Sequence, residues 1–188
     1  MAFDLFEEAF RLGGAIRAGV ALLAGATVFI VVDAWLDRRT EQRRSSGAAI
    51  GFALLAGVTL DGVPENLAMG VSLIESASPT LLVAIFASNL PESLVGAQRM
   101  REAGFTPGRI MTIWTATAVL LAAAVLAGYI ALDGVADETL SWPLGFAGGA
   151  VLASLADTLM PEAYREGGPY VAYATALGFL LSFMLSSA

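Results

Sequence analysis

Three Pro-Glu pairs lie inside long apolar stretches of the chain, at Pro64-Glu65, Pro91-Glu92 and Pro161-Glu162. Proline removes a backbone hydrogen-bond donor from a helix and leaves the carbonyl four residues earlier without its partner. A carboxylate at the centre of a bilayer costs roughly 2.5–3.5 kcal/mol or more. Because the sequence carries this costly combination three times, we predict that these groups coordinate a cation on its way across a membrane.

The first two pairs belong to a degenerate internal repeat, in which residues 61–67 (DGVPENL) align with residues 88–94 (SNLPESL). The polar residue that opens each motif stands four positions before the glutamate, so both share one helix face. Antiparallel neighbouring helices with facing polar sides would therefore form an oxygen-rich cluster near the middle of the membrane. The candidate metal ligands in this cluster are Asp61, Glu65, Asn66, Ser88, Asn89 and Glu92.

Several carboxylates cannot share a dry pocket unless protons or a positive charge compensate them. Neither motif contains Arg, and the chain contains no His and no Cys, so any bound metal must use oxygen or thioether ligands. Hard oxygen ligands favour Mn²⁺, Mg²⁺ or Fe²⁺ relative to zinc, although carboxylate sites also bind Zn²⁺. The alternative interpretation is a proton-sharing polar network that only fixes helix packing.

The third pair ends the stretch 157–162 (DTLMPE). Its helix is predicted to place Asp157 past the middle of the membrane and Glu162 near the cytoplasmic mouth, which makes both candidates for the exit path of the ion. The alternative is a capped helix end whose glutamate extends to water. Asp33 is interpreted as part of a solvated helix end.

The composition determines what kind of scaffold positions these residues. The chain has 188 residues, of which 57% are hydrophobic and 14% charged, whereas soluble domains carry about 25% charged residues. Several apolar runs reach the roughly 20 residues needed to cross a bilayer. We therefore predict an all-α polytopic membrane helix bundle of about six transmembrane helices. The predicted spans are 13–36, 47–74, 79–98, 109–132, 143–164 and 169–187, with Trp142-Pro143 as the turn before the fifth.

Residues 1–12 are too few for a span and are predicted to form a short amphipathic helix, either interfacial or the end of a truncated longer span. Residues 13–188 are predicted to form a single transmembrane domain, because no linker is long enough to separate two. We expect no cleavable leader at the N-terminus of this sequence. The formal net charge of −7 gives no electrostatic case for nucleic-acid binding, and the hydropathy excludes soluble enzymes.

The arginines predict the orientation in the lipid bilayer. The stretches 37–44 and 99–109 are rich in Arg and lie on the same side of a six-span bundle, whereas the loop 133–138 contains three acidic residues and no Arg. The positive-inside rule then places the Arg-rich loops in the cytoplasm and both termini outside, in a multi-pass protein of the inner cell membrane.

The paired Pro-Glu motifs, the stretch 157–163 (DTLMPEA) and the closing residues 178–180 (GFL) resemble the ZIP family of divalent-metal transporters. The resemblance covers residues 13–188 as the third to eighth of the family's eight helices, with residues 1–12 as the end of the second. It implies a metal site between the family's fourth and fifth helices, zinc or a related metal as substrate, no organic cofactor, a homodimer, and termini outside the cell.

The resemblance implies that Glu65 and Glu92 are metal-binding glutamates. Asp61 stands where the family commonly has a His, Ser88 where it often has His or Gln, and Asn89 where an acidic or amide residue is common. These departures exclude a nitrogen-rich zinc site. The span 109–132 also lacks the carboxylate that some relatives contribute to a second metal, so we predict one oxygen-ligand site.

Three functional hypotheses follow. The preferred one is divalent cation transport by alternating exposure of the central cluster, with no enzymatic activity. The second is a non-transporting ZIP-like protein that acts as a metal sensor or interaction partner, favoured by the loss of His and the apparent absence of the family's first helix. The third is an intramembrane aspartyl protease using Asp61 and Asp157, but the glycine-flanked signature is missing around Asp157.

Overall fold

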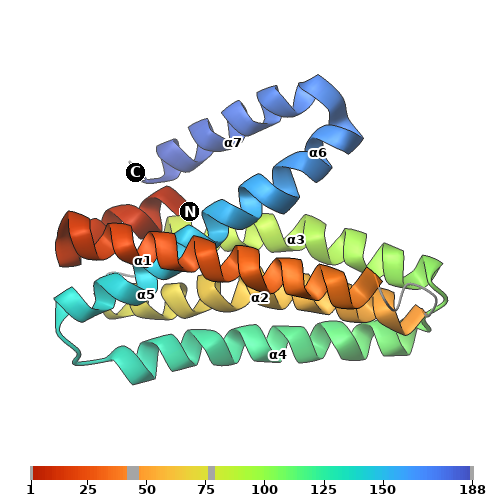
Figure 1. Cartoon of the computed structure of the whole chain (residues 1–188), viewed down its shortest axis with the longest axis horizontal. Helices are drawn as coiled ribbons and strands as arrows, with labels where there is room; N and C mark the ends of the chain where they lie inside the picture. Colours follow the sequence, from red (N-terminus) through yellow and green to blue (C-terminus); the bar gives the residue numbers. More distant parts are fainter. Residues whose placement is uncertain (1, 42–46, 76–78, 187–188) are drawn as a thin grey trace.

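The computed structural model describes residues 2–41, 47–75 and 79–186, which are helical apart from short turns and include no strand. The prediction of an all-α bundle is confirmed (Figure 1). The elements are α1 (Ala2–Glu41), α2 (Gly47–Glu75), α3 (Pro79–Glu102), α4 (Pro107–Leu132), α5 (Asp137–Ser154), the π-helical turn η1 (Leu155–Leu159), α6 (Met160–Gly167), the 3₁₀ turn η2 (Gly168–Tyr170) and α7 (Val171–Ser186).

The described helices include stretches long and apolar enough to cross a membrane. Four such stretches are found in the described ranges, namely Ala2–Leu36, Leu81–Glu102, Pro107–Leu132 and Asp137–Met184, the last of which runs from α5 into α7. Large apolar side chains on these helices face outward, with Ile16 82%, Ile130 70% and Phe179 72% exposed. Such a surface is suited to lipid rather than to water, so the chain is a polytopic membrane protein.

The first helix reverses direction near its start. Gly14 has φ 74° and ψ 173°, a conformation that is essentially restricted to glycine. The segment 2–13 therefore turns back alongside the rest of α1 (Figure 1). Leu5 and Ala9 in this segment are buried, and the Ser141 hydroxyl of α5 donates a hydrogen bond of 2.7 Å to the Ala9 carbonyl. The short N-terminal helix thus packs along α5.

Small residues let two pairs of helices pack with their backbones in contact. A Cβ added to Gly149 of α5 would come within 1.9 Å of the Leu22 carbonyl oxygen of α1. In the same way, a Cβ added to Gly70 of α2 would come within 2.1 Å of the Val125 carbonyl oxygen of α4. Close approach of this kind is typical of helices that associate in lipid. The pairs α1–α5 and α2–α4 are therefore tightly joined, whereas α6 and α7 project from the bundle (Figure 1).

The start of the fifth predicted span is wrong by six residues. The turn predicted at Trp142-Pro143 does not occur, because α5 begins at Asp137 and contains Pro143 in its interior. Leu140, Ser141 and Leu144 are almost completely buried around this proline. Packing against α1 outweighs the one backbone hydrogen bond that proline removes, a loss that membrane helices tolerate.

Candidate metal site

The first Pro-Glu motif lies within α2, where Pro64 is inside the helix. Glu65 is 5% exposed and Asn66 is 8% exposed, so both are buried. The Asn66 side-chain amide donates a hydrogen bond of 2.8 Å to the carbonyl of Gly62, one turn earlier. Because an amide oxygen only accepts, this bond leaves the oxygen of Asn66 available to accept a hydrogen bond or to bind a cation. The side chain of Asp61 lies outside the described part.

The second motif lies within α3, with Pro91 inside the helix. Ser88 donates its hydroxyl proton to the Ile85 carbonyl at 3.0 Å, and Ser93 donates to the Leu90 carbonyl at 2.8 Å. Each hydroxyl thus satisfies its donor within its own helix and keeps oxygen lone pairs for another partner. Ser88, Asn89 and Glu92 are all half-buried.

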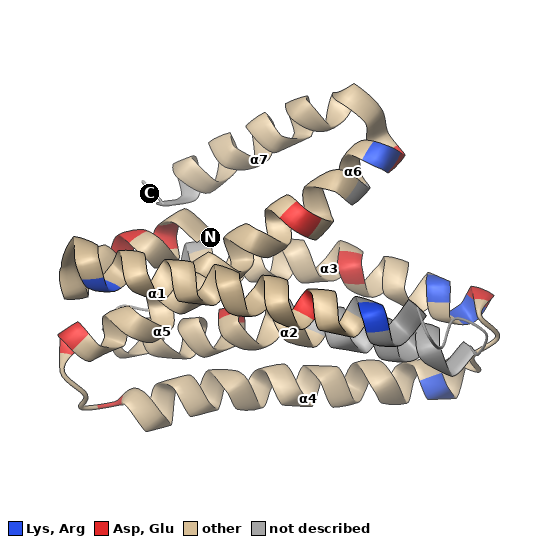
Figure 2. Ribbon diagram, in the orientation of Figure 1, with Lys and Arg blue, Asp and Glu red and all other residues tan. Residues whose placement is uncertain are grey.

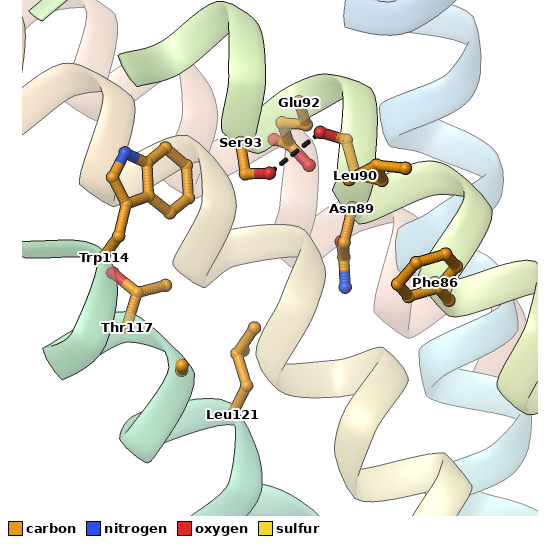
Figure 3. Close-up of a pocket in the computed structure, with 9 residues that line it drawn as sticks. Phe86, Asn89, Leu90, Glu92, Ser93, Trp114, Thr117 and Leu121 are labelled. Atoms are coloured by element: carbon orange, nitrogen blue, oxygen red, sulfur yellow. Dashed lines mark hydrogen bonds between the residues drawn. The ribbon is translucent and has the colours of Figure 1, made fainter. Parts of the chain in front are cut away.

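A pocket of about 230 Å³ lies between α3 and α4 beside the second motif. Asn89 and Glu92 reach it from α3, while Trp114, Thr117 and Leu121 reach it from α4 (Figure 3). The described residues that line it are Phe86, Asn89, Leu90, Glu92, Ser93, Trp114, Thr117, Ala118 and Leu121. Among the described lining residues the one carboxylate therefore comes from α3, in agreement with the absence of acidic residues from residues 109–132.

Leu121 connects the two motifs spatially. It lines the pocket together with Asn89 and Glu92, and one of its methyl groups would lie 2.8 Å from a Cβ added to Gly62 of α2. The α2 motif and the α3 motif therefore approach the same residue of α4 from two sides. Within the described side chains, no three acidic, His or Cys residues gather closely enough to hold a metal ion. The six-residue ligand cluster stays a prediction, since the Asp61 side chain is outside that part.

The third motif begins in the π-helical turn η1 and ends in α6, where Pro161 and Glu162 lie. The Met160 N–H donates to the Leu155 carbonyl, five residues earlier, and Pro161 follows directly. Such turns often occur at functional sites in helices. Asp157 is exposed, while the Glu162 side chain lies outside the description. The exit path stays a prediction, and only Pro161 gave a sequence signal for the altered helix.

Two further differences from the sequence interpretation concern residues outside the motifs. Asp33, interpreted as part of a solvated helix end, is half-buried, and α1 continues beyond it to Glu41. Trp114, Thr117 and Leu121 form the α4 wall of the pocket, and no sequence pattern identified them. Which residues line such a pocket depends on how two helices pack against each other. A local sequence motif does not contain that information.

Two zinc transporters are similar to this chain. Zinc transporter GufA of Myxococcus xanthus is 29% identical over 188 residues, covering 91% of this chain and 70% of GufA. Zinc transporter ZIP11 of Homo sapiens is 32% identical over 151 residues, covering 75% of this chain and 44% of ZIP11. The chain is related to the ZIP family.

The predicted ZIP resemblance is therefore confirmed. No family profile and no solved structure matches the chain. In this ZIP relative the two Pro-Glu motifs lie on α2 and α3, which contact each other directly.

Proposed function

We propose that this ZIP relative transports a divalent metal ion across the membrane through an oxygen-ligand site between α2 and α3. The observation that carries the proposal is the approach of two Pro-Glu motifs, on contacting helices, to the same residue, Leu121. The similarity to GufA and ZIP11, both named zinc transporters, supports metal ions as the substrate class.

In this proposal the carboxylates of Asp61, Glu65 and Glu92 are the charged ligands. Asn66, Ser88 and Asn89 contribute neutral oxygens, and the hydrogen bonds of Asn66 and Ser88 leave these oxygens able to do so. A divalent cation offsets the cost of keeping several carboxylates at membrane depth. The ligand chemistry suits Mn²⁺, Fe²⁺ and Mg²⁺ as well as the Zn²⁺ suggested by the relatives.

Alternating exposure of this site requires that one group of helices move against another. The glycine contacts join α1 to α5 and α2 to α4, which gives two bodies with rigid internal packing. In the proposed cycle the α2–α4 body carries α3 and the ion past the α1–α5 body. Asp157 and Glu162 then line the exit path.

The orientation and assembly are also part of the proposal. The Arg-rich ends of the helices lie in the cytoplasm and both termini outside, as the positive-inside rule predicts for an inner-membrane protein. A homodimer is supported by α7, whose large apolar residues are mostly exposed and which touches the rest of the chain only lightly. A second copy would cover part of this surface.

The binding site is tested with the purified full chain in detergent. Calorimetric titration with Zn²⁺ and Mn²⁺ compares the wild type with the double variant Glu65→Gln and Glu92→Gln, which keeps side-chain size and removes both charges. We expect saturable binding that weakens by at least about tenfold in the double variant, roughly the effect of 1.4 kcal/mol. Asp133→Asn, which removes one negative charge at an exposed helix end away from either motif, is the control. Equal affinity in all three proteins would disprove the site.

Transport is tested separately in lipid vesicles that contain the protein and a metal-responsive dye. The proposal requires metal-dependent dye signal in wild-type vesicles and its loss in the double variant. Saturable binding without flux would disprove transport and favour the metal-sensor hypothesis. Substitution of Mn²⁺ for Zn²⁺ outside the vesicles then ranks the substrates.

A further inference from the structure

Three exposed arginines gather at one end of the bundle. Arg99 and Arg101 lie in the last turn of α3, and Arg109 lies in the first turn of α4 (Figure 2). They flank the short turn 103–106. Because α3 and α4 both contain stretches able to span a membrane, this turn stands where the hydrocarbon layer ends and the headgroups begin.

The turn between the two helices is a fixed structure. Phe105 is 9% exposed and packs with Met100 and Ile110 in a small apolar cluster. Thr106 caps α4 by accepting a hydrogen bond of 3.4 Å from the backbone N–H of Arg109. The guanidinium carbon of Arg109 lies 4.6 Å from the centre of the Phe105 ring, a cation–π contact. The guanidinium of Arg109 is thus held in place before any partner binds.

Two of these arginines, Arg101 and Arg109, lack a counter-charge among the described residues. Within the described residues neither Arg101 nor Arg109 forms an ion pair, and the Glu102 carboxylate accepts a hydrogen bond of 3.0 Å from Gln98. Elsewhere in the described part, Arg17 of α1 pairs with Glu138 of α5, at the opposite end of the bundle. At the α3–α4 turn, Arg101 and Arg109 therefore present positive charge that no described carboxylate neutralises.

We propose that the α3–α4 turn binds the phosphate of anionic phospholipid headgroups through Arg101 and Arg109. Guanidinium groups bind phosphate oxygens in paired hydrogen bonds, and basic clusters next to a membrane span attract anionic lipids. The prior fixing of Arg109 on Phe105 reduces the side-chain freedom lost on binding. This inference does not depend on metal transport, because the metal-site residues lie deeper in α2 and α3.

The test uses the full chain in nanodiscs of phosphatidylcholine with increasing phosphatidylglycerol, and measures the shift in unfolding temperature. Wild type is compared with the double variant Arg101→Gln and Arg109→Gln, and with Arg17→Gln as a control that removes one arginine from the other end. We expect phosphatidylglycerol to stabilise the wild type and the control. Apparent lipid affinity should fall about fivefold for each arginine removed from the turn. An equal shift in the double variant would overturn the proposal.

Two further measurements test the role of the Phe105 ring and distinguish lipid from free phosphate. Phe105→Leu preserves an apolar side chain but removes the ring beneath Arg109, so lipid-dependent stabilisation should weaken while the unfolding temperature in pure phosphatidylcholine changes less. An undiminished lipid effect in this variant would contradict the role of the stacked arginine. Inorganic phosphate added to detergent-solubilised protein should give no comparable stabilisation. An equal effect from phosphate would overturn the assignment to lipid.

Discussion

At the scale of single residues, three side chains of the first two motifs donate hydrogen bonds within their own helices. Asn66 donates to Gly62, Ser88 to Ile85 and Ser93 to Leu90, all within one turn of the same helix. These intrahelical hydrogen bonds are important in lipid, where an unsatisfied donor costs several kcal/mol. The same arrangement would serve a cation, which needs acceptors and repels donors.

Glycine contacts give the sharpest residue-scale prediction. Gly149→Ala would place a methyl group 1.9 Å from the Leu22 carbonyl oxygen, so α1 and α5 must separate. We expect a loss of about 1–3 kcal/mol in the free energy of unfolding, as for other overpacked interiors. Thermal unfolding in detergent measures it. Gly178→Ala is the control, since nothing lies within 4 Å of a Cβ at that position. Equal unfolding temperatures in the two variants would contradict the close contact.

At the scale of elements, the reversal of α1 decides how the N-terminal segment packs. Residues 2–13 are amphipathic. They pack against α5, where Ser141 and Gly148 lie next to them. The reversal depends on the backbone of a single residue, Gly14. The sequence separates residues 1–12 from the span that begins at residue 13, but it does not predict that the chain reverses direction between them.

The reversal predicts unequal effects of two similar substitutions in α1. Gly14→Ala forces a side chain into a left-handed conformation and should cost about 1–3 kcal/mol of unfolding free energy. Gly19→Ala, in regular helix with nothing within 4 Å of its Cβ, should be neutral or slightly stabilising. Chemical or thermal unfolding, with helix content followed by circular dichroism, distinguishes them. A neutral Gly14→Ala would mean that the reversal is absent from the folded protein.

At the scale of the whole molecule, the structure consists of two tightly packed helix pairs and of elements, such as α7, that are attached more loosely. The α1–α5 and α2–α4 pairs are joined through glycine backbones, whereas α7 exposes most of its apolar surface. Tyr173, Leu177, Leu181 and Met184 recur at helical spacing along α7 and are at least 60% exposed. A surface of this kind is covered by lipid or by a second copy.

The proposed dimer interface on α7 can be tested by cysteine cross-linking. The chain contains no Cys of its own, so an introduced cysteine would be the only one. Leu177→Cys in native membranes should form a disulfide-linked dimer on mild oxidation. Leu126→Cys on α4, with 58% exposure against 60% for Leu177, is the matched control and should stay monomeric. Dimer formation at neither position or at both would contradict an α7 interface.

The sequence by itself determined the all-helical membrane class, the ZIP relationship and the identity of the two Pro-Glu motifs, because hydropathy and local spacing carry that information. Only the tertiary structure decided that Leu121 lies next to both motifs, that Gly14 reverses α1 and that α5 runs through Pro143. These features depend on which backbones approach each other. In lipid, that choice follows from the fit of small residues between distant helices, and hydrophobicity does not encode it.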